Sequence, residues 1–322
     1  MILAGDVGAT KILLEVGRSR SGRWETALAR RFATEDAASL EPVLDEFLRD
    51  WRAKPGARSI TAAAFGVAGP VEDNRVKMTN RPWVVDGARI ARRFRIPRVR
   101  VVNDLAAIAH GIPWIGPKGL ATIQAGRASE SDPRVVIGVG TGLGIAYLVP
   151  ANGTLHEVAG EGGHMGFGPA TLEQAELWRW IFDSGTRVSA ESILSGHGLA
   201  RVHAYVRAKG EHPGKLRDPS PEQITEAGLD GSDAACGAAL NLFVECLGTV
   251  AGDHALATMA RGGVYLAGGI VAKIVPRLQH GRFRDAFCAK PPHSAILARI
   301  PVRAVTAERV GMLGAARLAQ QR

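Results

Sequence analysis

The side chains best suited to chemistry in this sequence stand beside glycine-rich turns. Asn103 and Asp104 close the apolar segment "VVND", Glu161 and His164 lie within "AGEGGHMGFGP", and Glu191 lies in "VSAESILSGHG". A carboxylate and an imidazole can hydrogen-bond adjacent hydroxyls of a polyol. Asp104, at the carboxyl end of an expected strand, is placed to act as a general base if a hydroxyl comes within hydrogen-bond reach.

Each of these side chains also has a purely structural alternative. Asn103 or Asp104 could be the N-cap of a helix in "LAAIAHGI", and the structural and chemical roles can hold at once. Glu191 could be a favourable negative charge at a helix N-terminus. Glu161 and His164 could belong to a zinc site, but no further ligand lies at metal spacing. Local sequence leaves these alternatives open.

The first glycine-rich turn lies at the start of the chain, in "MILAGDVGATKILLEVG". Apolar runs enter and leave it, and the turn itself consists of Gly5, Asp6, Val7, Gly8, Ala9 and Thr10. Glycine supplies backbone angles that other residues resist, so a turn of this kind needs no functional explanation. On this stretch alone, an ordinary hairpin and a phosphate-binding turn are equally good interpretations.

Two further glycine turns follow. "GVGTGLG", which contains Thr141 and Gly142, superficially resembles a dinucleotide fingerprint, but Leu143 stands where the third glycine belongs and a β pattern follows instead of a helix. A hairpin whose backbone N–H groups could hold an anion fits better, with a plain turn as the alternative. In "VYLAGGI", Gly268 and Gly269 join a strand to a helix and allow another group, such as an adenosine, to approach the backbone closely.

The sequence has little that suggests covalent catalysis. No serine or cysteine stands with a convincing base partner, and no P-loop signature is present. Phosphoryl transfer needs mainly positioning and charge stabilisation, which glycine turns and a few carboxylates can supply. The set therefore favours phosphoryl transfer.

The elements that must position these residues alternate between strands and helices, which predicts an α/β fold. Ser39, the pair Thr171 and Gln174, and the group Ser220, Pro221 and Gln223 mark helix starts. Asn152-Gly153 is a hairpin signal. A hairpin with a glycine turn, and a strand leading into a glycine turn and helix, each occur twice, which indicates a duplicated architecture of two related domains.

Composition indicates a soluble globular protein, with 46% hydrophobic and 22% charged residues. We expect neither a membrane span nor a signal peptide, and three widely spaced cysteines suit buried positions in a reducing compartment, so the cytoplasm is the expected location. The net charge of +9 could suit nucleic acid, a membrane surface or small anions. The densest basic stretch, "ARIARRFRIPRVRVV", is better interpreted as the solvated face of a helix.

The ordered set of motifs resembles the bacterial glucokinase family of the actin–hexokinase–Hsp70 superfamily. The set is "GDVGATK", "GVAGPV", "VVND", "GVGTGLG", "AGEGGHMGFGP", "SAESILSG", "LAGGI" and "GMLGAA", and it covers essentially the whole chain. The resemblance implies a two-domain actin-like (ribonuclease H-like) α/β fold with duplicated βββαβαβα-type domains around a cleft. A small domain would span 1–113, with a C-terminal helix, 306–322, packing back onto it, and a large domain would span 114–305.

The resemblance also implies roles for individual residues. Residues Gly5 to Thr10 would form the first phosphate hairpin, with Asp6 near Mg²⁺ through water. Thr141 and Gly142 would belong to the second hairpin, and Gly268 and Gly269 to an adenosine motif. Asp104 would take the proton of the glucose 6-hydroxyl. The sugar contacts would come from Asn103, Asp104, Glu161, His164 and Glu191. The implied enzyme is an ATP-dependent glucokinase that acts as a homodimer, without nucleic-acid or membrane partners.

The sequence departs from the glucokinase pattern at two positions. Ala9 and Lys11 stand where "GDVGGTN" is usual, and lysine there is common in the related ROK group of repressors and kinases. ROK members usually carry a cysteine-rich zinc motif after the histidine, which "GFGPATLEQAELW" lacks, so no zinc is expected. A kinase of another hexose or amino sugar, or a sugar-binding regulator, remains an alternative, and ADP or polyphosphate remains an alternative donor.

Overall fold

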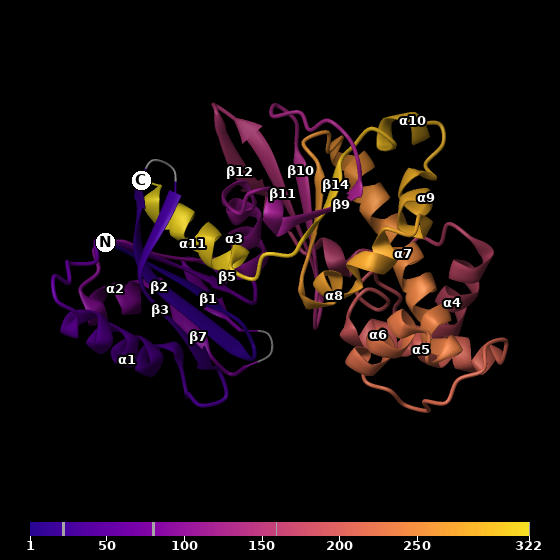
Figure 1. Ribbon diagram of the computed structural model, residues 1–322, viewed down its shortest axis with the longest axis horizontal. Coiled ribbons are helices and arrows are strands. Elements are labelled where there is room, and N and C mark those ends of the chain that lie inside the picture. Colours follow the sequence, from indigo (N-terminus) through magenta and orange to yellow (C-terminus); the bar gives the residue numbers. More distant parts are fainter. Residues whose placement is uncertain (21–22, 79–80, 159, 322) are drawn as a thin grey trace. The chain divides into compact units, whose positions relative to one another are not determined.

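The computed structural model describes residues 1–20, 23–78, 81–158 and 160–321 (Figure 1). The chain forms two compact units. Unit 1 comprises Met1–Gly119 with Ala307–Arg322, and unit 2 comprises Leu120–Thr306. The sequence-based division placed the first boundary at 113/114 and the start of the returning segment at 306. The final segment of the chain thus belongs to the same unit as its beginning.

Unit 1 is built on a five-stranded sheet with the order β3-β2-β1-β4-β8. β1 pairs antiparallel with β2, and β2 with β3, whereas β1, β4 and β8 run parallel. The strands are β1 (Ile2–Val7), β2 (Lys11–Arg20), β3 (Arg23–Ala33), β4 (Ala62–Val67) and β8 (Val99–Asn103). A small second sheet consists of β5 (Val71–Glu72), β6 (Arg75–Lys77) and β7 (Val84–Asp86). The helices are α1 (Leu40–Ala53), α2 (Gly87–Phe94), α3 (Asp104–Gly111) and α11 (Val310–Gln320), with short 3₁₀ turns at Ile112–Trp114 and Pro117–Gly119.

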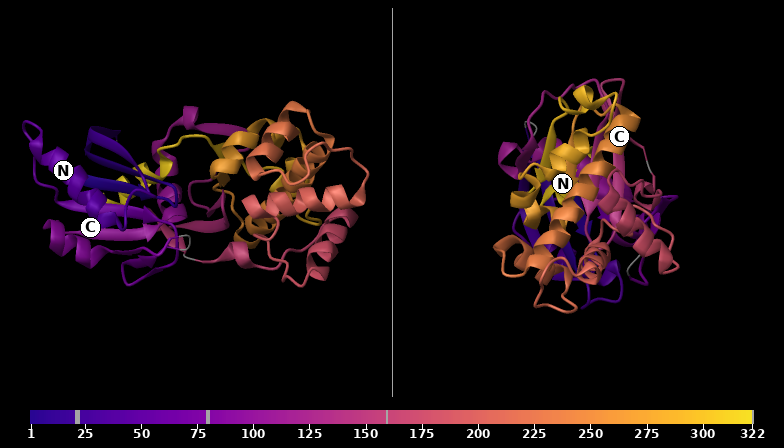
Figure 2. Two further views of the ribbon diagram at one scale, coloured as in Figure 1. Left: turned by 90° about the horizontal axis from the view of Figure 1, so that it is seen from below. Right: turned by 90° about the vertical axis from the view of Figure 1, so that its right-hand side faces the viewer.

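Two buried clusters hold unit 1 together. One contains large side chains of α1 and the sheet, including the fully buried Phe47 and Phe65. The other consists of small residues, in which alanines of β1 and β4 pack against Met312 and the alanines of α11. Figures 1 and 2 show α11, in yellow, beside the indigo strands of the chain's first residues. The C-terminal helix is therefore an integral part of the core of this unit.

Unit 2 is built on a six-stranded sheet with the order β12-β11-β10-β13-β14-β9. β10, β11 and β12 are antiparallel, β10, β13 and β14 are parallel, and β9 closes the edge antiparallel to β14. The strands are β9 (Leu120–Gln124), β10 (Arg134–Val139), β11 (Leu143–Ala151), β12 (Thr154–Val158), β13 (Val264–Ala267) and β14 (Val302–Val305). The helices are α4 (Leu172–Asp183), α5 (Gly196–Lys209), α6 (Pro221–Asp230), α7 (Ala234–Thr258), α8 (Gly269–Leu278), α9 (Arg282–Cys288) and α10 (Ser294–Leu297), with a 3₁₀ turn at Gly162–His164.

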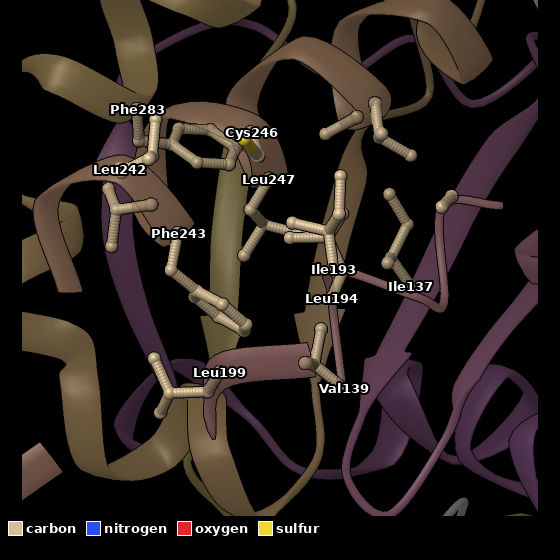
Figure 3. Packing of buried hydrophobic residues seen from close by; sticks show 14 of the residues in the cluster. Ile137, Val139, Ile193, Leu194, Leu199, Leu242, Phe243, Cys246, Leu247 and Phe283 are labelled. Atoms are coloured by element: carbon tan, nitrogen blue, oxygen red, sulfur yellow. The ribbon is translucent and has the colours of Figure 1, made fainter. Parts of the chain in front are cut away.

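The long helix α7 is the centre of the unit 2 core. Its residues Phe243 and Leu247 share a buried cluster with side chains of β10, α5 and α9 (Figure 3). The sequence predicts no membrane span, but by length and composition α7 could cross a membrane; 72% of the apolar window of this helix is buried inside the protein. Gly248 and Gly252 let α9 approach closely, since a Cβ there would lie 2.3 Å from the Phe283 oxygen and 2.6 Å from the Phe287 oxygen, respectively. These glycines reflect close packing and do not break the helix.

The helix-start signals differ in how fully they are realised. Ser220 and Gln223 form a complete capping box at α6. At α4, Thr171 accepts the bond from the Gln174 N–H, but the Gln174 side chain bonds the Ala170 N–H, so the expected capping box is only half formed. Ser39 occupies the N-cap of α1 without a side-chain hydrogen bond. The local sequence pattern predicts where each of these helices starts. Whether the cap side chain makes its hydrogen bond depends on the side-chain geometry.

Several sequence predictions are confirmed. The fold is mixed α/β with several sheets. Asn152 and Gly153 both have positive φ in the turn between β11 and β12. In the basic stretch, Ile90 and Phe94 are buried on α2 while the arginines face solvent. All three cysteines are free, with Cys236 and Cys246 buried and Cys288 half-buried.

Candidate active site

The first glycine turn connects β1 to β2 in unit 1. Asp6 pairs with Leu13 and Val7 with Ile12 across the hairpin, and the Gly8 N–H donates to the Lys11 oxygen at 2.9 Å. Gly5 is buried, and a Cβ there would lie 2.5 Å from a ring carbon of Phe65, so this glycine serves packing between strands. The turn itself is accessible at Thr10.

Ala9 fits this turn without backbone strain. Neither Gly8, Ala9 nor Thr10 has a positive φ, so the conformation does not require glycine at position 9. The Ala9 oxygen accepts a hydrogen bond from Arg81 Nε at 3.1 Å. The methyl group of Ala9 can therefore affect a ligand only through the space that it takes beside the turn.

Asp6 is a carboxylate in an unfavourable environment for its charge. Burial, together with the negative charge of Asp104, raises its pKa to about 6, and the nearby Lys11 ammonium partly opposes this. A buried acid beside a second acid is stabilised by a cation. The donor chemistry therefore fits a hard divalent ion such as Mg²⁺, which prefers carboxylate and water oxygens.

Asn103 and Asp104 lie where β8 ends and α3 begins. The Asn103 side-chain oxygen accepts from the N–H groups of Leu105 and Ala106, at 2.9 and 3.3 Å, and is the N-cap of α3. Its side-chain nitrogen donates to the Gly69 oxygen at 3.1 Å. Asp104 is the first helical residue, and its Oδ1 accepts from the Leu105 N–H at 2.8 Å. Asn103 is thus the N-cap of α3, the structural role that the sequence left open. As the cap, Asn103 also orients the neighbouring Asp104.

The second glycine turn connects β10 to β11 in unit 2, and Glu191 bonds directly to it. Glu191 Oε2 accepts from the Leu143 N–H at 2.9 Å. A Cβ on Gly142 would lie 2.6 Å from the same oxygen, so glycine is needed for this approach. The Gly140 oxygen accepts from the Gly196 N–H at 2.8 Å, at the start of α5. Thr141 is exposed at the tip of the turn.

Glu161, His164 and Glu191 form a row of polar groups. His164 Nδ1 lies 3.8 Å from Glu191 Oε1, and its Nε2 lies 4.0 Å from Glu161 Oε2. The backbone supports this row, because the Glu191 N–H donates to the Gly163 oxygen at 2.9 Å and the His164 N–H to the Glu161 oxygen at 3.0 Å. Glu161 and His164 are exposed, so their polar atoms are available to a ligand. The structure thus brings Glu191 beside Glu161 and His164, the pair that the sequence places in one motif.

Gly268 and Gly269 join β13 to α8. Gly268 has a φ of 102°, and a Cβ there would lie 2.2 Å from the Val139 oxygen, immediately before the second glycine turn. Gly269 is exposed with open space around it. The first glycine therefore permits strand packing, and the second leaves room for another molecule.

Two residues outside the sequence motifs also support the site. The Thr34 hydroxyl donates to the Gly8 oxygen at 3.0 Å, and the Thr34 N–H donates to the Thr10 oxygen at 3.1 Å, so this buried residue holds both sides of the first turn. Arg187 donates to the His164 oxygen at 2.9 Å. Neither residue stands in a glycine motif, and no sequence signal pointed to them.

Among the described residues, one buried group of donors could hold a metal ion: His203, Asp233 and Cys236. His203 Nε2 has no hydrogen-bond partner. However, the Asp233 oxygens already accept from three backbone N–H groups. Burial, with Asp233 beside it, raises the pKa of Cys236 to about 12, whereas a metal binds the thiolate. The Arg207 guanidinium also acts on His203 and Cys236 and would repel a cation. We therefore assign this group to capping and packing of α7.

Three comparisons with known proteins point to one family. The family model described as Glucokinase matches residues 3–322. A protein named glucokinase from Mesorhizobium japonicum is 37% identical over 322 residues, covering 99% of this chain and 91% of that protein. The crystal structure of a glucokinase from an Antarctic psychrotroph has a TM-score of 0.88 at 29% identity, with 99% of this chain and 98% of that chain covered.

A more distant structural neighbour belongs to the ROK family. It is a glucokinase from Streptomyces griseus in complex with glucose and AMPPNP, with a TM-score of 0.67 at 22% identity and coverage of 100% and 99% of the two chains. At this identity the likeness shows the fold alone.

Proposed function

Because the chain belongs to the glucokinase family and is an enzyme of that class, we propose that it transfers the γ-phosphoryl group of ATP to the 6-hydroxyl of D-glucose. The products are glucose 6-phosphate and ADP. The observation that carries the proposal is the pair of carboxylates in unit 1. Asp104 stands at a helix start and Asp6 in the first glycine turn, and the negative charge of Asp104 contributes to the raised pKa of Asp6.

Asp104 is the proposed general base. It accepts the proton of the 6-hydroxyl as the bond from that oxygen to the γ-phosphorus forms and the bond to the bridging oxygen of ADP breaks. The Asn103 cap and the Leu105 N–H hold the Asp104 carboxylate in place. This positioning would account for much of the rate, because phosphoryl transfer requires little covalent participation by the protein.

The two glycine hairpins and Gly268-Gly269 are proposed to bind the nucleotide. Residues 5–10, Thr141 and Gly142 would present backbone groups to the phosphates, while the open space at Gly269 would receive the adenosine. Asp6 would hold Mg²⁺ through a water molecule, and the bound ion would neutralise charge that develops between the phosphates. Lys11, whose ammonium already acts on Asp6, would add a positive charge beside this turn.

Asn103, Asp104, Glu161, His164 and Glu191 are proposed to hydrogen-bond the sugar hydroxyls. The alignment of Glu161, His164 and Glu191 supports a polyol ligand, since their acceptors and donors alternate along a short row. Glu191 also bonds the second hairpin, so it would link sugar contacts to the phosphate turn.

We propose the actin-like fold with duplicated domains for the two units. Support comes from the strand orders, since three antiparallel strands followed by two parallel strands occur as β3-β2-β1-β4-β8 and again as β12-β11-β10-β13-β14. We also propose that the enzyme is a cytoplasmic homodimer whose ligands are a sugar and a nucleotide. Light scattering would test whether it is a dimer.

The decisive experiment replaces Asp104 with alanine. We expect the variant to lose phosphorylation by at least about 100-fold, the lower end of the usual contribution of a general base. Glucose binding, measured by calorimetry, should survive in weakened form. Substantial turnover by Asp104→Ala would refute the assignment of the base.

A coupled assay across several hexoses and amino sugars, with ATP, ADP and polyphosphate as donors, separates the alternatives. Preference for another sugar would identify a different hexose or amino-sugar kinase. Absence of turnover with every sugar and donor would favour a sugar-binding regulator instead.

A further inference from the structure

The motif "GMLGAA" near the end of the chain has no role in the mechanism proposed above. It forms the first turns of α11, from Gly311 to Ala316. α11 packs against three elements of unit 1. These are α3, which begins with Asp104, β1, which carries Asp6, and β4, which pairs with β1 in the sheet. The C-terminal helix therefore contacts every element that positions the two carboxylates of unit 1.

Glycines bring the backbones of α3 and α11 into direct contact. A Cβ on Gly314 would lie 1.6 Å from the Ala107 oxygen, and a Cβ on Gly111 would lie 2.0 Å from the Val310 oxygen. α3 also lies close to β4, since a Cβ on Gly66 of β4 would lie 2.8 Å from the Ala107 Cβ. No side chain can be accommodated at these crossings, so the distance between α11 and α3 is set by backbone contact.

Gly311 differs from these packing glycines because it faces the Asp6 carboxyl group. A Cβ there would lie 3.2 Å from Oδ2, 3.3 Å from Cγ and 3.6 Å from Oδ1 of Asp6, and these are its three nearest neighbours. Such a contact is closer than ordinary van der Waals distance, so the carboxyl group would have to move by a few tenths of an ångström. Asp6 and Gly311 are nonetheless far apart in sequence.

We propose that Gly311 is a positioning residue: by lacking a side chain it lets the Asp6 carboxylate keep the orientation in which it would hold the hydrated Mg²⁺ of the nucleotide. The inference rests on the proposed function. It adds the C-terminal helix to the parts of the protein that determine nucleotide binding, although no residue of α11 contacts the reacting atoms. Gly311 is buried, so a methyl group at this position would press directly on the Asp6 carboxyl group.

A Gly→Ala series separates positioning from helix stability. Alanine is favoured over glycine within helices, so where space allows the substitution should raise Tm. Gly237, on α7, has no atom within 4 Å of its ideal Cβ and provides the matched control. Gly314→Ala provides a destabilised control. Its Cβ would collide with the backbone of α3, so the Tm of this variant should be lower than that of wild type.

For Gly311→Ala we expect Tm to stay within the range set by wild type and Gly237→Ala. The Mg²⁺ concentration needed for half-maximal binding of AMPPNP, measured by calorimetry, should rise about tenfold, as for loss of a group that orients a metal ligand. Glucose affinity should remain unchanged. Gly237→Ala should show the wild-type Mg²⁺ requirement.

A double-mutant cycle with Asp6→Asn tests whether the effect acts through Asp6. If it does, adding Gly311→Ala to Asp6→Asn should not change the Mg²⁺ requirement further. The inference would be overturned if Gly311→Ala had the wild-type Mg²⁺ requirement, or if its effect on that requirement added to the effect of Asp6→Asn in the double variant. A decrease in Tm as large as that of Gly314→Ala would also overturn it. Failure of the wild-type protein to bind the nucleotide or phosphorylate glucose would instead refute the proposed function, and the inference with it.

Discussion

At the scale of single residues, Asp6 is a carboxyl group whose ionisation is unfavourable in the folded protein. Burial and the charge of Asp104 raise its pKa to about 6, from an ordinary value of 3.8, while Lys11 only partly compensates. The charged form therefore costs folding free energy unless a cation binds. A carboxylate in this state is suited to bind Mg²⁺, because the ion removes the cost of ionisation.

This pKa predicts a specific pH dependence of stability in the absence of Mg²⁺. Below about pH 4 Asp6 is protonated in both the folded and unfolded chains and contributes nothing. As the pH rises from about 4 to 6, the unfolded chain loses its proton first, so Asp6 lowers the free energy of unfolding by an amount on the order of 3 kcal/mol, complete above about pH 6. Asp6→Asn should abolish this loss.

Urea unfolding of both proteins from pH 4 to 8 is the measurement. Asp6→Asn should be more stable than wild type at pH 7, and the two should converge near pH 4. Equal stability of the two proteins at pH 7 without Mg²⁺ would show that Asp6 is not desolvated.

Ala9 is the second residue whose effect can be predicted. Its φ is not positive and its oxygen is held by Arg81, so the turn already has a conformation that alanine tolerates. Ala9→Gly should therefore lower the free energy of unfolding by about 0.4–1 kcal/mol, through greater freedom of the unfolded chain. We expect KM for ATP and kcat to stay near their wild-type values in a steady-state assay. A large gain in ATP affinity would show instead that the methyl group crowds the phosphate.

At the scale of elements, the residues that the sequence marks as helix caps do lie at helix starts, but they differ in the hydrogen bonds that they make. Ser220 makes its full capping box, Thr171 makes half of one, and Ser39 makes no side-chain bond. Asn103 caps α3 and also fixes the loop at Gly69. A cap signal therefore locates a helix start reliably, while the energy that it contributes depends on the neighbours.

This difference predicts unequal effects for two serine substitutions. Ser220→Ala should lower the free energy of unfolding by about 1 kcal/mol, because the Gln223 N–H loses its acceptor. Ser39→Ala should cost less, since no hydrogen bond is removed. Urea denaturation of the two variants side by side provides the measurement, and a larger loss for Ser39→Ala would contradict the prediction.

At the scale of the whole molecule, the chain leaves unit 1 after Gly119 and returns to it at Ala307. The returning helix α11 supplies Met312 and a row of alanines to a core that also contains Ala4 and Ala64. Unit 1 is therefore completed only by the last residues of the chain.

A chain ending at Thr306 should lose the fold of unit 1. Truncation would expose the alanine face of β1 and β4 and the backbone of α3, which α11 covers. We expect limited proteolysis to cleave within 1–119 while unit 2 remains resistant, and phosphorylation to be absent. Wild-type resistance of the 1–119 segment in the truncated chain would show that α11 is dispensable for folding.

The sequence by itself determined the local features. Alternating elements predicted the α/β class, turn residues predicted the hairpins, and the ordered motifs predicted the glucokinase family, which the comparisons confirm. These inferences succeeded because turn chemistry, capping and hydrophobic pattern depend on neighbours within a few residues.

Only the tertiary structure decided which residues meet. The bond from the Leu143 N–H to Glu191, the packing of Phe65 against Gly5 and the approach of Gly311 to Asp6 join segments that are distant in the sequence. No local pattern encodes such contacts, because they depend on how strands register and how closely helix backbones approach. Glycine illustrates the difference: sequence locates it, but only the fold shows whether its missing side chain serves a turn, a packing contact or a ligand.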